Sequence, residues 1–130
     1  MLSQESHIRE LDLSYLEQRL ADLKDWHEDD AKYAVERYKN FLILVIRHPD
    51  KVLAPAPDID EAWHHHILHT MQYTRDCLEI FGEYLHHTPV NKSRPEEKTL
   101  MEEARERTSI LYQKEFGDPY LLELDISTFW

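Results

Sequence analysis

The sequence DIDEAWHHHILHTMQYTRDCLEIF, residues 58–81, is the stretch that decides the fold. Its apolar residues recur every three or four positions, which is the period of an α-helix with one buried side. Pro55 and Pro57 disfavour helix in the residue before each of them, so we expect residues 54–60 to be extended. Gly82 is well placed to end the helix. The pattern therefore predicts one helix over residues 61–81.

Three further helices are predicted at residues 14–26, at residues 29 or 30 to 48, and at residues 95–116. The first begins with Ser14 and Glu17, which have the spacing of a capping box. Pro49 is expected to end the second helix and Gly117 the last. We therefore expect an all-α fold, a compact bundle of about four main helices with an irregular C-terminal tail. It should form a single helical domain over residues 1–130.

The composition of the chain limits its partners and its location. Fifteen basic and 26 acidic residues give a net charge of −11, which opposes binding to phosphate backbones and anionic membranes. The first residues lack the basic and apolar regions of a secretory signal, and the longest apolar run, residues 41–46, is too short to cross a bilayer. The single cysteine cannot form an internal disulfide. We expect a cytoplasmic, acidic protein that binds neither nucleic acid nor membrane.

The C-terminal tail, residues 118–130, is rich in aromatic and aliphatic side chains. They are Tyr120, Leu121, Leu122, Leu124, Ile126, Phe129 and Trp130. So much apolar surface is unfavourable in water. We therefore expect the tail to pack onto the domain or to engage a partner protein.

The histidines of residues 61–81 fall on different sides of the predicted helix. Its apolar stripe consists of Trp63, Ile67, Met71, Cys77, Leu78 and Phe81. On a single helix, His65, His69 and Asp76 lie opposite this stripe. His65 and His69 have a spacing that can chelate a metal, but a solvated polar face is the simpler interpretation.

His64 lies one helical turn after Asp60, and we expect it to border the apolar stripe. A carboxylate and an imidazole at this spacing can bind one ion together, or one can orient the other. His86 and His87 follow Gly82, so a chain that turns back could supply a third ligand; exposure at a helix end is the alternative. Asp60, His64 and His87 are thus a candidate metal site. Two histidines and one carboxylate suit zinc or non-haem iron.

His66 is expected at the other edge of the stripe, close to Tyr73. A histidine at the edge of the core, hydrogen-bonded to a tyrosine or a backbone carbonyl, is the simplest interpretation. Cys77 is expected to be a small buried side chain rather than a nucleophile, because no cationic neighbour is evident in the sequence to lower its pKa. Trp63 and Tyr73 are most simply core residues.

Residues 60–89 resemble the glycine-rich domain-containing protein-like family through the pattern D-x-x-W-H-x-H-I-L-x-T-x-x-Y-x-x-D-C-x-x-x-F-G-x-x-L-x-H-x-P, of which every specified position is met. The resemblance implies that the family's motif positions are Asp60, Trp63, His64, His66, Tyr73, Asp76, Cys77 and His87. It favours His64, His66 and His87 over His65 and His69. The chain looks like the short, stand-alone bacterial type, since it has two glycines and no glycine-rich region.

Two functions are compatible with these observations. The first is a metal-binding helical protein with zinc or iron at Asp60, His64 and His87, whose chemistry would be that of a hydrolase or an oxygenase. Tyr73 or Asp76 would support the ligands. The second is a non-catalytic interaction module, in which the Trp-His-x-His motif is a hydrogen-bonded network and the tail or the acidic surface engages a partner. The sequence leaves open whether the protein is an enzyme.

Overall fold

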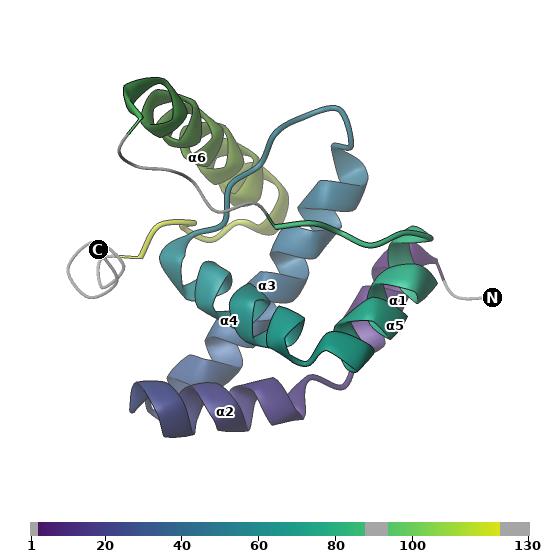
Figure 1. The fold of residues 1–130 in the computed structure, drawn as a ribbon. Helices are drawn as coiled ribbons and strands as arrows, with labels where there is room; N and C mark the ends of the chain where they lie inside the picture. Colours follow the sequence, from purple (N-terminus) through teal and green to yellow (C-terminus); the bar gives the residue numbers. More distant parts are fainter. Residues whose placement is uncertain (1–2, 88–93, 123–130) are drawn as a thin grey trace.

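The fold is taken from a computed structural model that describes residues 3–87 and 94–122. Within these ranges the chain forms six α-helices and no strand. They are α1 (Gln4–Glu10), α2 (Ser14–Lys24), α3 (Glu28–Arg47), α4 (Pro57–Leu68), α5 (Thr70–Phe81) and α6 (Pro95–Phe116). The other helices are arranged around α3, which contacts α1, α2, α4 and α6 (Figure 1). The all-α prediction is confirmed, with six helices where about four were expected. In the described ranges no helix is both long and apolar enough to cross a membrane.

Helix α3 is central because it buries side chains against several neighbours. Its buried apolar residues are Ala31, Ala34, Val35, Tyr38, Phe41, Leu42, Ile43 and Leu44. Leu16 and Leu20 of α2, Ile8 of α1 and Ile59 of α4 belong to the same core. Each such aliphatic side chain contributes about 1.5–3 kcal/mol when fully buried. The predicted helix is therefore confirmed, and His27 caps its first turn.

The N-terminal part differs from the prediction. Helix α1 was not expected, and Lys39 of α3 holds its end by donating to the carbonyls of Arg9 and Leu11. The capping-box prediction was wrong, because Ser14 is already helical. The Asp12 carboxylate instead accepts hydrogen bonds from the backbone N–H and the hydroxyl of Ser14. An aspartate two residues upstream thus satisfies the first free donor of α2.

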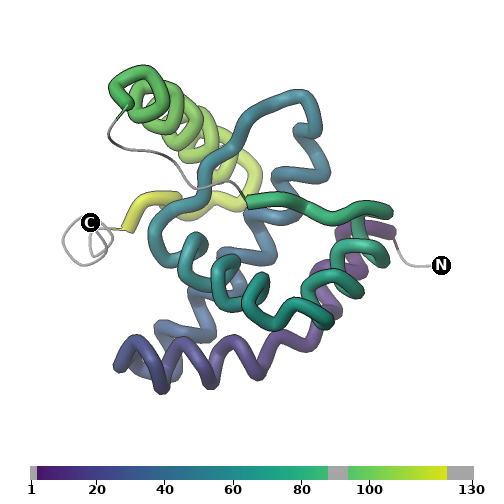
Figure 2. The backbone as a smooth tube through the Cα atoms, viewed as in Figure 1, coloured from purple at the N-terminus to yellow at the C-terminus, as the bar shows by residue number. Residues whose placement is uncertain are grey.

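The predicted helix over residues 61–81 is broken at His69 into α4 and α5. In a continuous helix the His69 N–H would donate to the His65 carbonyl. Here the His69 N–H donates to the His66 carbonyl instead. The His65 carbonyl oxygen is contacted by the His69 imidazole, whose Nδ1 atom lies 2.8 Å away. The start also differs, since α4 begins at Pro57 and residues 57–60 are helical, not extended. The sharp change of direction between the helices is visible in Figure 2.

The break rotates α5 relative to the stripe expected for one helix. Met71 and Leu78 were predicted to be buried, but they are 80% and 55% exposed. Asp76 was predicted on the solvated face, but it is buried at 2% exposure. Trp63 and Cys77 are buried as expected. Because of the one-residue interruption at His69, α5 buries a different side from the one expected for a continuous helix.

Arg37 connects the segment after α6 to the core through hydrogen bonds. This buried guanidinium forms a two-pronged ion pair with Asp58, at 2.7 and 3.1 Å, and donates to the carbonyls of Pro119 and Tyr120. The Tyr120 hydroxyl joins the same segment to Ala54 by donating to its carbonyl. Tyr120 thus packs onto the domain, as predicted for the tail, whereas Leu121 is 39% exposed. Residues 123–130 lie outside the described residues.

Candidate functional site

A buried chain of hydrogen bonds connects α3, α4 and α5 through His66. The His66 Nε2 atom lies 2.9 Å from the Asp76 carboxylate, and its Nδ1 atom lies 2.7 Å from the Tyr38 hydroxyl. Gln72 donates to the other Asp76 oxygen at 2.8 Å. His66 and Asp76 are each 2% exposed, and Tyr38 is fully buried. The three helices are therefore joined by one polar connection inside the core.

All of these hydrogen bonds can be formed with a single proton on the His66 ring. An ionised Asp76 can only accept, so the His66 Nε2–H donates to it. With that single ring proton on Nε2, the His66 Nδ1 atom accepts from the Tyr38 hydroxyl. Burial raises the pKa of Tyr38 well above its ordinary value, so this phenol keeps the proton that it donates. The chain Tyr38–His66–Asp76 is thus fully satisfied without an outside partner.

A second buried branch runs through Tyr73, whose ring contacts that of His66 edge-on. The Tyr73 hydroxyl accepts from the Trp63 indole N–H at 2.9 Å and donates to the Leu85 carbonyl at 2.5 Å. Burial raises the pKa of Tyr73 and also that of the neighbouring Cys77 thiol. Cys77 is therefore a buried, protonated side chain, as predicted, and a poor nucleophile.

The Tyr73 branch should be measurable as stability. Replacing Tyr73 by phenylalanine leaves the Trp63 N–H and the Leu85 carbonyl without their buried partner, so we expect a loss of about 1–3 kcal/mol in the free energy of unfolding. Urea denaturation measures it. Tyr84→Phe is the control, because Tyr84 is 39% exposed and should change stability by less than about 0.5 kcal/mol. Equal stability of the two variants would show that the branch contributes little.

Of the two histidines after α5, His87 is the one that returns to α4. Its Nε2 atom lies 2.6 Å from the Asp60 carboxylate, and its ring stacks on Trp63 with a centroid distance of 4.1 Å. The side chains of His87 and Asp60 are 19% and 50% exposed. This pair therefore lies at the surface end of the buried network, next to the indole that takes part in the Tyr73 branch.

The predicted positions of His64 and His65 are exchanged. His64 is exposed and not at the edge of the core, whereas His65 was expected in solvent and is 7% exposed. The assumed stripe combined residues from both sides of the break at His69, whereas α4 alone packs against α2 and α3 with a different side, which includes Ile59 and Ala62. In residues 3–87 and 94–122 no three His, Cys, Asp or Glu side chains are grouped so that they could hold a metal ion. A metal site at Asp60, His64 and His87 stays a prediction.

Sequence reasoning missed several members of the buried network. It gave no role to Tyr38 or Gln72, because neither belongs to the histidine-rich motif. It also missed the ion pair of Arg37 and Asp58, which are 21 positions apart. Residues 31–44 contain three cations, Lys32, Arg37 and Lys39, so the sequence pattern does not single out Arg37.

His65 gives the site a pH dependence. Burial lowers its pKa below the ordinary value of 6.5. The unfolded chain therefore takes up this proton at a higher pH than the folded chain does, so stability should fall as the pH drops below about 6.5. We expect the His65→Gln variant to lose less stability than the wild type between pH 7.5 and pH 5.5. Urea denaturation at both pH values tests this, with His64→Gln at the exposed neighbouring position as the control. Equal losses in the two variants would contradict it.

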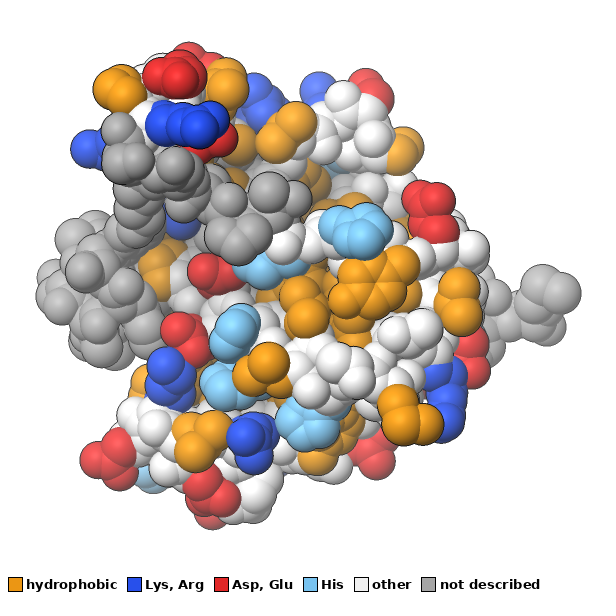
Figure 3. All heavy atoms as spheres, in the orientation of Figure 1, with side chains coloured by type: hydrophobic (Ala, Val, Ile, Leu, Met, Phe, Trp, Pro, Cys, Tyr) orange, Lys and Arg blue, Asp and Glu red, His pale blue; other side chains and the backbone are white. Residues whose placement is uncertain are grey.

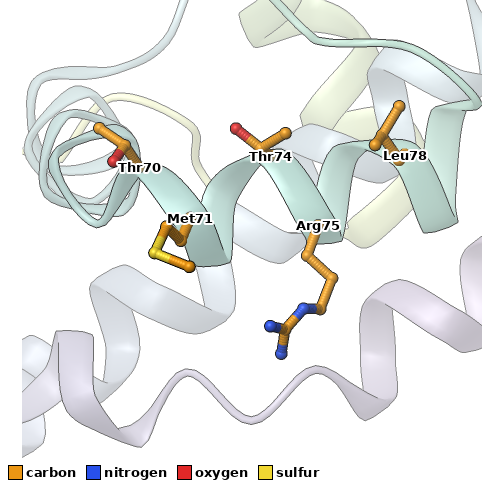
Figure 4. A pocket seen from close by; sticks show the side chains of 5 residues that line it. All are labelled: Thr70, Met71, Thr74, Arg75 and Leu78. Atoms are coloured by element: carbon orange, nitrogen blue, oxygen red, sulfur yellow. The ribbon is translucent and has the colours of Figure 1, made fainter.

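Two surface hollows lie near the network. A groove of about 330 Å³ is bordered by residues 52–55, by Trp63 with His86 and His87, and by α6. A shallower hollow of about 460 Å³ lies along one side of α5, where Figure 4 shows Thr70, Met71, Thr74, Arg75 and Leu78. In the space-filling view, histidine side chains gather beside hydrophobic ones on the face that α4 and α5 present (Figure 3).

Comparison with known proteins assigns the chain to a family through a family model alone. No curated protein and no solved structure matches the chain. The resemblance of residues 60–89 to the glycine-rich domain-containing protein-like family stays a prediction. A family model described as UCP032817-like matches residues 3–112, a range that includes the complete Tyr38–His66–Asp76 network and the Asp60–His87 pair. The chain therefore belongs to the UCP032817-like family.

Proposed function

We propose that this chain is a non-catalytic protein-interaction module in which the Trp-His-x-His motif is a structural hydrogen-bonded network. The observation that carries the proposal is that the polar atoms of the buried motif residues are paired within the protein. This holds for Trp63, His66, Tyr73 and Asp76, of which none is more than 5% exposed. Residues buried to this extent offer little surface to a substrate, but they can fix how the helices pack.

The surface supports an interaction role for the module. Apolar side chains border the groove next to α6, and two of them, Val52 and Leu100, are 72% and 63% exposed. Grouped exposed apolar residues are typical of sites that bind other proteins. The net charge of −11 favours a partner with a basic surface.

A metal-binding function is the second candidate, and the contact between Asp60 and His87 favours it. The two side chains come from distant segments, are 2.6 Å apart and are partly exposed. His64 is on α4 one turn after Asp60, but the structure does not group it with Asp60 and His87, so its side chain would have to move to complete the site. Zinc bound there would supply a Lewis acid or an activated water, and iron would supply sites for oxygen.

Metal analysis of purified, untagged protein separates the two candidates. The interaction module predicts far less than one zinc or iron per chain, and the same content in wild type and His87→Ala. His27→Asn is the control, because it removes an exposed histidine and keeps a good helix cap. Near-stoichiometric metal that is retained in His27→Asn and lost in His87→Ala would contradict the module and support the metal site.

A further inference from the structure

The groove next to α6 is apolar over most of its surface. Leu100 and Met101 of α6 face Val52 and Leu53 across it, and the stacked pair of Trp63 and His87 forms one border. Its volume of about 330 Å³ suits one or two side chains of a ligand. The strongly exposed Val52 and Leu100 would remain uncovered by a small molecule inside the groove. A longer apolar segment would cover them.

Glu97 gives this groove a specific polar group. Its Oε2 atom is buried, and it has no hydrogen-bond partner in the part of the chain that the structure describes. A buried carboxylate oxygen has lost water without a replacement, which is unfavourable until a donor arrives. Arg105 and Arg107 lie on the same helix, but each donates to a backbone carbonyl of residues 52–55. Glu97 thus has unused capacity to accept a hydrogen bond.

We propose that the groove next to α6 binds an apolar segment of a partner protein that carries a lysine, with the lysine ammonium on Glu97. An ammonium is a point charge and can use one oxygen, whereas the guanidinium fork of arginine prefers both oxygens of a carboxylate. The net charge of −11 attracts such a basic segment. This inference rests on the proposed function as an interaction module and adds the chemistry of the partner.

A peptide titration tests the inference. The probes are acetyl-Ala-Leu-Lys-Leu-Ala-amide and two matched peptides with glutamine or glutamate in place of lysine, each added to full-length ¹⁵N-labelled protein. We expect amide shifts concentrated at Leu53, Leu100 and Met101. The lysine peptide should bind about fivefold more tightly than the glutamine peptide, because the ammonium supplies the donor that the buried Glu97 oxygen lacks, and the glutamate peptide should bind least.

The variant Glu97→Gln should remove the preference for lysine but keep the glutamine peptide bound. Glu102→Gln is the matched control, because it makes the same charge change at an exposed position of α6 and should keep the preference. Absence of binding, equal binding of the lysine and glutamine peptides, or shifts centred on Met71 and Leu78 would overturn the proposal. Each of these results would reject the binding of a lysine-containing segment in the groove, but not the interaction module. The module itself would be rejected by the metal analysis, if near-stoichiometric metal is present in the wild type and lost in His87→Ala.

Discussion

Replacing Arg37 by methionine is expected to lower the free energy of unfolding by about 3–5 kcal/mol. The guanidinium is 1% exposed and is paired with an Asp58 side chain that is 7% exposed. Burial acts to lower the pKa of Arg37, but the hydrogen-bonded Asp58 outweighs it and raises the pKa above the ordinary value. Without the guanidinium, Asp58 would be a buried charge with its partner removed. The carbonyls of Pro119 and Tyr120 would also lose a donor.

Urea denaturation of Arg37→Met and Arg47→Met measures this difference. Arg47 also forms two ion pairs, with Glu5 and Glu115, but its side chain is 38% exposed. Because water screens exposed ion pairs, Arg47→Met should cost less than about 1 kcal/mol. Similar losses in the two variants would show that Arg37 does not fasten the segment after α6. A second check is Tyr120→Phe, which keeps the ring and removes the hydroxyl that bonds Ala54 and Ala56.

Replacing His66 by alanine should have the second largest effect, a loss of about 3 kcal/mol or more. The substitution removes the donor to Asp76 and the acceptor for Tyr38, and it leaves a cavity between helices. Both partners are almost completely buried, so water cannot replace the lost hydrogen bonds without opening the core. The role of His66 in the motif would thus be to stabilise the folded protein.

Thermal or urea unfolding of His66→Ala is compared with that of His64→Ala. His64 is in the same motif and the same helix, but it is exposed, so its substitution should change stability by less than about 0.5 kcal/mol. If His64→Ala is as unstable as His66→Ala, the distinction between a buried and an exposed motif histidine is wrong.

Periodicity and helix-ending residues predicted the regular parts of the fold. Helix α6 has the predicted bounds, with Pro95 in its first turn and Gly117 in the left-handed conformation after its end. The break at His69 could not be predicted in this way, because residues 61–81 contain no proline and no glycine. It depends on a side-chain hydrogen bond to His65, which competes with the helical one and is stabilised by tertiary packing.

The site was predicted only in part. A return of His86 or His87 and a hydrogen bond of His66 to a tyrosine were among the alternatives considered; the structure has both, with His87 at Asp60 and Tyr38 at His66. The pairing of His66 with Asp76 requires α4 and α5 to lie against each other, which a map of one straight helix excludes. Contacts between helices depend on their relative positions, which residue spacing along one helix does not give.

A double-mutant cycle on His66 and Asp76 tests the structural network most directly. The free energies of unfolding of wild type, His66→Ala, Asp76→Ala and the double variant give the coupling energy of the pair. A hydrogen-bonded pair inside the core, at 2.9 Å and 2% exposure, predicts a coupling of about 1.5–3 kcal/mol. Additive effects, with a coupling within about 0.5 kcal/mol of zero, would contradict the conclusion that the motif forms a connected structural network.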